Sequence, residues 1–218
     1  MSLKVYDFHT DIANVLVTPQ IRCRFMKMEV GQEAGGHTHD LGQEIFLVLQ
    51  GRAEFEVSGE RATLGPGEFC IALVDQYHSV RNVGDEEVIM FLSVTPHIQP
   101  THTFWNEDGT KKPPRFMPAG SYDEPADRDT PTAELAERHT AAAAALAESA
   151  AAAGNVQQQE ADRCVQALEA GDQQAAEAAR ERMWNAVSDV LGRAMKLGDT
   201  WNTFAARTAD PPAGAPDA

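Results

Sequence analysis

The stretch GQEAGGHTHDLGQEIFLVLQG, residues 31–51, carries two histidines and a glutamate at spacings that suit two consecutive β-strands. His37 and His39 are two residues apart, so in a strand both imidazoles point to the same side. A turn through residues 40–42 can then bring Glu44 on the returning strand to the same point. Residues 45–49 are apolar on both faces, so a second sheet, an N-terminal segment or another subunit must cover the outer face.

A second stretch, LGPGEFCIALVDQYHSVRN at residues 64–82, ends in a segment that can deliver His78 to the same point from another strand. Three imidazole nitrogens and one carboxylate oxygen suit a first-row transition metal better than calcium or magnesium, which favour oxygen ligands. We therefore predict that His37, His39, Glu44 and His78 bind one divalent transition metal. The alternative is that these histidines are only solvated or hydrogen-bonded and that little metal binds.

Residues 12–95 consist of short β-type runs that Gly, Pro, Asn and Asp interrupt every ~8–12 residues, which is typical of an antiparallel sandwich or barrel. The clearest strand is 52–57, where Ala53, Phe55 and Val57 alternate with charged residues. Further strands are expected at 22–29, 68–74, 77–83 and 87–94.

These stretches resemble the cupin family, whose first motif is the pattern Gly31, His37, His39, Glu44 and Gly51. The resemblance covers roughly residues 15–96. It implies a mainly β protein with a jelly-roll barrel of about six to eight strands. It also implies metal-ligand roles for the three histidines and the glutamate already named.

The second motif of the family matches less closely. Pro66 and Gly67 fit its turn, and His78 with Asn82 fits its end. Residues 75–77, however, stand where a proline-containing segment is common. This departure leaves the metal ligands in place and makes the mouth of the pocket harder to predict.

The rest of the chain divides by composition. We expect a cupin β-barrel at 1–105, a proline-rich linker or wrapping arm at 106–131, a helical region at 132–208 and a disordered tail at 209–218. Ala, Glu, Gln and Arg dominate the helical region, and glycines at 154 and 171 predict breaks that give about three helices. One stripe of apolar residues in the last helix favours packing, within the chain or across a dimer, over a dedicated protein-binding module.

Side chains from the strands and from the segment after them are candidates to line or cover the pocket. Phe46 and Val48 share the face of Glu44 by the period of two, so they should line the cavity. His97 and His102 follow the barrel and could fold over its mouth with Trp105, although a surface position is commoner for such histidines.

The formal net charge of −15 disfavours nucleic acid and anionic membranes as partners. No stretch approaches the ~18 apolar residues of a membrane span, and the first residues do not form a secretory leader, so we expect a soluble, cytoplasmic protein. Three widely spaced cysteines argue against a disulfide framework. The expected partners are a small-molecule substrate and a second copy of the chain in a homodimer.

The leading functional hypothesis is a metal-dependent enzyme that acts on a small oxygenated organic molecule, most simply a dioxygenase with Fe2+. Mn2+, Ni2+, Zn2+ or Cu2+ are also compatible, and the first three would support an isomerase, lyase or decarboxylase. In either case Glu44 is the expected catalytic residue, because a carboxylate beside the metal can accept a proton from substrate. A non-catalytic sensing or storage protein, or a structural dimer whose helices only cover the barrel, remain the alternatives.

Overall fold

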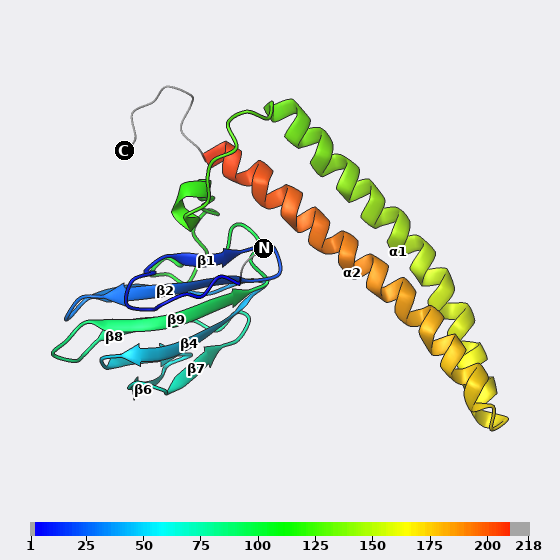
Figure 1. The fold of residues 1–218 in the computed structure, drawn as a ribbon, viewed down its shortest axis with the longest axis horizontal. Coiled ribbons are helices and arrows are strands. Elements are labelled where there is room, and N and C mark those ends of the chain that lie inside the picture. Colours follow the sequence, from blue (N-terminus) through cyan, green and yellow to red (C-terminus); the bar gives the residue numbers. More distant parts are fainter. Residues whose placement is uncertain (1–2, 210–218) are drawn as a thin grey trace. The chain divides into compact units, whose positions relative to one another are not determined.

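The computed structural model describes residues 3–209, which form nine strands, one short 3-10 helix and two long helices (Figure 1). One compact unit comprises the described residues up to Arg128 together with those from Ala205, and the other comprises Asp129–Phe204. The elements in chain order are β1 (Asn14–Val17), β2 (Arg22–Met28), β3 (Glu33–His37), β4 (Gln43–Gln50), β5 (Ala53–Val57), β6 (Glu60–Leu64), β7 (Phe69–Ala72), β8 (His78–Asn82), β9 (Val88–Thr95), η1 (Ala119–Tyr122), α1 (Thr132–Glu169) and α2 (Gln173–Ala209).

The first unit is a sandwich of two antiparallel sheets. Their strand orders are β1-β2-β9-β4-β7 and β3-β8-β5-β6. The predicted strands coincide with β2, β5, β7, β8 and β9. The expected jelly-roll barrel of about six to eight strands is confirmed as two antiparallel sheets, which contain nine strands and do not close, because within residues 3–209 no strand pairing joins them. Consecutive strands β3 and β4 lie in different sheets, so the loop between them crosses from one layer to the other instead of continuing a ladder.

The hydrophobic core lies between the two sheets. Phe46 of β4 and Phe55 of β5 are buried, and their ring centroids are 5.2 Å apart. On β4 burial alternates as the period of two requires, with Glu44, Phe46 and Val48 inside. Along one edge β4 pairs with the edge strand β7, and Phe69 and Ile71 of β7 are exposed on the outer face of the sheet.

The helical unit is an antiparallel hairpin of two helices. The expectation of about three helices is wrong, because α1 continues through Gly154 and the chain reverses only at Gly171. A glycine costs about 1 kcal/mol in a helix interior, and the alanine-rich sequence around position 154 outweighs that cost. Gly171 differs because its φ of 73° is the left-handed conformation that ends a helix.

Residues 106–131 contain little regular structure apart from η1. The segment nevertheless contacts the sandwich, because the Asp123 carboxylate accepts hydrogen bonds from the backbone and side-chain nitrogens of Asn14 at 2.8 and 2.9 Å. The predicted disordered tail begins at residue 209, which is the last residue of α2, and residues 210–218 lie outside the described residues. No helix in the described part of the chain is long and apolar enough to cross a membrane. Cys23, Cys70 and Cys164 are free thiols.

Candidate metal centre

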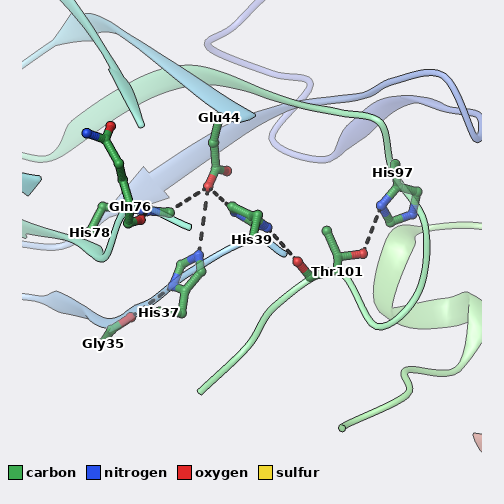
Figure 2. Close-up of polar contacts among 8 residues, drawn as sticks. All are labelled: Gly35, His37, His39, Glu44, Gln76, His78, His97 and Thr101. Carbon is green, nitrogen blue, oxygen red and sulfur yellow. Dashed lines mark hydrogen bonds and ion pairs between the residues drawn. The ribbon is translucent and has the colours of Figure 1, made fainter. Parts of the chain in front are cut away.

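The four predicted ligands come together at one end of the sandwich (Figure 2). His37 ends β3 and lies directly opposite His78, the first residue of β8. His39 follows in the crossing loop, and Glu44 projects inward from β4. Their ligand atoms all lie within 4.8 Å of one another, and we refer to these four residues as the His–Glu cluster.

One oxygen of Glu44 is the centre of the cluster. The Nε2 atoms of His39 and His78 lie 2.8 and 3.2 Å from Glu44 Oε2. His37 Nε2 lies 3.8 Å from the same oxygen, which is too long for a hydrogen bond, and this buried nitrogen has no other hydrogen-bond partner. The cluster therefore contains an unsatisfied polar atom that points toward its centre.

The other ring nitrogen of each histidine is engaged by a backbone carbonyl. Nδ1 contacts Gly35 O in His37, Thr101 O in His39 and Gln76 O in His78, at 3.2, 2.5 and 2.8 Å (Figure 2). A carbonyl can only accept a hydrogen bond, so each Nδ1 donates to its carbonyl and each Nε2 is turned toward the centre. Carbonyl contacts of this kind orient histidines that bind metals.

The centre thus collects three Nε2 atoms and a carboxylate, which are ligand types of transition-metal sites. Burial alone would raise the pKa of the Glu44 carboxyl, but the contacts with the three imidazoles outweigh burial and hold its pKa well below the ordinary range. The residues present therefore fit a divalent metal with mixed nitrogen and oxygen ligands.

A glycine allows the two strands that carry His37 and His78 to approach. The ring of Tyr77 lies over Gly36, and a Cβ atom at position 36 would stand 1.9 Å from the Tyr77 hydroxyl oxygen. A side chain at position 36 would therefore require the exposed ring of Tyr77 to move.

His102 lies beside the cluster, a position that the sequence left uncertain. Its ring centroid is 4.6 Å from that of His37 and 5.0 Å from that of His39. Burial, and then these two histidines, lower the pKa of His102 to about 2, so the ring is neutral. It is not one of the four converging ligands. The segment after β9 has no periodic pattern, so its position is set by contacts such as the pairing of Thr38 with Thr103 and the contact of the Thr101 carbonyl with His39.

His97 lies farther from the centre and is buried. Its Nδ1 contacts the hydroxyl of Thr101 at 3.0 Å, and the backbone carbonyl of the same threonine holds His39 (Figure 2). Burial, and then the charge of Arg22, lower the pKa of His97 to about 3. His97 therefore helps to position the backbone at Thr101, whose carbonyl orients the predicted metal ligand His39. Trp105 donates a hydrogen bond to the hydroxyl of Thr38, the residue before His39, at 3.2 Å.

A cavity of about 170 Å³ opens beside the cluster. Phe46 lines it as predicted, whereas Val48 lies deeper in the hydrophobic core. Arg22 and Arg24 also line it, and this position was not predicted because charged residues of a strand are usually assigned to its solvent-exposed face. The period of two contained the missed signal, since both share the face of the core residue Met28.

Residues 24–95 match the family model described as a cupin domain. This segment is a cupin domain. It is 33% identical over 69 residues to the polyketide synthase CurC of Streptomyces cyaneus, covering 32% of this chain and 45% of the relative. It is 30% identical over 69 residues to an oxalate-binding protein of Thermotoga maritima, covering 32% of this chain and 56% of the relative. The chain thus matches about half the length of these curated relatives.

The cupin domain is also similar to a solved structure from Klebsiella pneumoniae, described as an uncharacterized conserved protein with a double-stranded β-helix domain. That comparison gives 26% identity and a TM-score of 0.41, and it covers 44% of this chain and 91% of the other.

Proposed function

We propose that this chain is a metal-dependent enzyme that acts on a small oxygenated organic molecule, and that its reaction is a dioxygenation. The observation that carries the proposal is the convergence of three Nε2 lone pairs and the Glu44 carboxylate beside a cavity of about 170 Å³. Four protein ligands leave up to about two positions of an octahedral metal for substrate and dioxygen. Fe2+ is the favoured metal, and when bound it supplies the redox chemistry.

Different residues of the protein bind the metal, accept the proton and line the cavity. The three histidines hold the metal, and the backbone carbonyls that accept from their Nδ1 atoms fix the direction of each ring. The Glu44 carboxylate is ionised, so it serves as a ligand and as the acceptor of a proton from substrate. Phe46 and Leu92 supply apolar walls that limit the access of water to the cavity.

A second candidate is a binding protein without catalysis. It is favoured by the relative described as an oxalate-binding protein, whose 69 matched residues are 30% identical to this chain. In that case the metal and the cavity would hold a small ligand, and no substrate would be converted.

We also propose that the working form is a homodimer formed through the outer face of the five-stranded sheet. Ile45, Phe69 and Ile71 leave apolar surface exposed there, and a second copy would remove it from water. Size-exclusion chromatography with light scattering tests this point: Phe69→Glu should convert a dimer to a monomer and leave metal content unchanged.

Elemental analysis of untagged protein, followed by oxygen consumption with a panel of diketones, phenols and thiols, tests the enzyme proposal. Iron together with substrate-dependent oxygen uptake supports the dioxygenase. Zinc, nickel or manganese with substrate turnover but no oxygen uptake would replace it with an isomerase, lyase or decarboxylase. Bound metal with saturable ligand binding and no turnover would favour the second candidate.

A further inference from the structure

Two arginines face the interior of the sandwich on the same sheet as Glu44. Arg22 pairs with Val94 of β9, and Val94 pairs in turn with Glu44 of β4. These three residues therefore form one row across the sheet, and paired residues in a row point to the same face. Neighbouring strands lie ~4.8 Å apart, so the backbones at 22 and 44 are only about 10 Å apart.

Arg24 lies in the adjacent row. It pairs with Leu92, which pairs with Phe46, and all three line the cavity that also reaches His37, Glu44 and His78. Two long cationic side chains thus enter the same small cavity from one side, while the His–Glu cluster borders it from the other strands.

Neither arginine forms an ion pair among the described residues, and the charges of Asp123 and Glu44 act on Arg24 only from a longer distance. Arg22 is only 4% exposed, and the Nε atoms of both Arg22 and Arg24 are buried without a hydrogen-bond partner among the described residues. The guanidinium of Arg22 lies 5.4 Å from the ring centroid of Tyr122, a contact that supplies no negative charge. Glu44 is the one acidic residue in the described lining of the cavity, and its oxygen is already engaged by the histidines.

A buried guanidinium without an anion is costly, and a second one beside it adds repulsion. Burial, and then the charge of Arg22, lower the pKa of Arg24, which is the direction this repulsion requires. The planar fork of an arginine matches a carboxylate by two parallel hydrogen bonds, so a carboxylate is the anion that best satisfies the unpaired Nε groups. A divalent metal in the cluster would add positive charge and strengthen the preference.

We propose that Arg22 and Arg24 form an anion subsite that binds the carboxylate of a small organic acid beside the His–Glu cluster. The inference rests on the proposed function in one respect, because it makes this acid the substrate or ligand of the metal site. The cavity of about 170 Å³ has the volume of about six water molecules at ~30 Å³ each, which limits the acid to a few carbon atoms.

Calorimetric titration of the protein as purified with malonate and with malonamide tests the subsite. The two probes have nearly the same size and shape, but only malonate is an anion. Malonate should bind and malonamide should not. Arg22→Gln and Arg24→Gln should each weaken malonate binding by about tenfold or more, since each removes a charge-assisted hydrogen bond.

Arg61→Gln is the matched control, because Arg61 is exposed on β6 and pairs with Glu54 and Glu56 outside the cavity. It should bind malonate as the parent does. Arg24→Lys, which keeps the positive charge, should bind malonate more tightly than Arg24→Gln. Because Arg22 is buried, circular dichroism must establish that Arg22→Gln is folded. If this variant does not fold, the Arg24→Gln variant of the half-buried Arg24 is used to test the subsite.

Equal binding of malonate and malonamide, or parental affinity for malonate in a folded Arg24→Gln variant, would overturn the subsite. Metal content measured on the same samples shows whether the arginine subsite or the metal-dependent enzyme has been refuted. A parent that holds metal while the arginine variants bind malonate normally refutes only the subsite. A parent that binds malonate through the arginines but retains no metal refutes only the metal-dependent enzyme.

Discussion

The cupin domain and the helical hairpin both bury polar side chains, but they satisfy them differently. In the hairpin, donors meet acceptors: the Ser149 hydroxyl donates to Asp189 at 2.6 Å, and the Gln157 amide donates to the carbonyl of Met183 at 2.8 Å. In the cupin domain, the Nε2 atom of His37 and the Nε atoms of two arginines remain unsatisfied around one carboxylate.

The paired polar groups of the hairpin stabilise its fold, whereas the unsatisfied polar groups of the cupin domain are those that we propose bind a metal and an anion. Matched pairs between α1 and α2 stabilise the hairpin and need nothing more. Unmatched acceptors and unmatched cations in the cupin domain cost free energy in the protein alone, and a metal and an anion would recover that cost. The following experiments test the contrast.

The largest effect is expected at His39. His39→Ala removes one Nε2 ligand, so metal affinity should fall by at least about 100-fold, beyond the ~10–100-fold typical of groups that only support a ligand. Elemental analysis and competition with a chelator measure the change, and circular dichroism should show a folded sandwich.

Ser149→Ala is the hairpin control for this experiment, because it removes a buried polar group that has its partner. It should cost about 1 kcal/mol of stability and leave metal affinity unchanged. Parental metal content in His39→Ala would contradict the assignment of the metal centre.

A smaller effect is expected from pH. The pKa of His97 is about 3 in the folded protein against 6.5 in an exposed histidine, so between these values the unfolded chain binds the extra proton. The stabilising contribution is therefore complete above pH 6.5 and is lost as pH falls toward 3. From pH 7 to pH 5 this histidine should reduce the free energy of unfolding by up to about 2 kcal/mol.

Urea unfolding at several pH values measures this dependence, and His97→Gln is the matched variant. The variant should lose less stability than the parent over the same pH range. An identical slope in both proteins would mean that His97 is not held neutral in the folded state.

The smallest effects are expected at two glycines of the hairpin. Gly154→Ala should stabilise the hairpin by up to about 1 kcal/mol, since an added Cβ there meets nothing within 4 Å and the helix continues through the site. Gly171→Ala should destabilise it by about 1 kcal/mol, because φ is 73° at the turn. Thermal unfolding measures both changes, and effects of the same sign would argue for a third helix.

The sequence predicted the ligand cluster because three of its four members are close in sequence and the fourth ends a second recognisable motif. A spacing of two residues places His37 and His39 together, one turn returns Glu44, and the pairing of β3 with β8 brings in His78. Their roles as ligands, and that of Glu44 in catalysis, stay predictions. The positions of His102 and the two arginines could not be found so easily. The position of His102 depends on a segment without periodicity. Arg22 and Arg24 are exceptions to the rule that inward positions of a strand are apolar.

The errors in the fold have a similar origin. Glycine at 154 and glycine at 171 are equal by propensity, and only the backbone conformation and the capping hydrogen bonds at 170–172 distinguish a break from a continuous helix. Alternation predicts individual strands well, but it does not say which edges pair. The two open sheets therefore could not be distinguished from a closed barrel.

The contact between Gly36 and Tyr77 has an evolutionary consequence. Because the tyrosine ring occupies the space that a Cβ would need, a larger residue at 36 is tolerated only if the side chain at 77 turns outward or is smaller. Among homologous chains the residues at these two positions should therefore vary together.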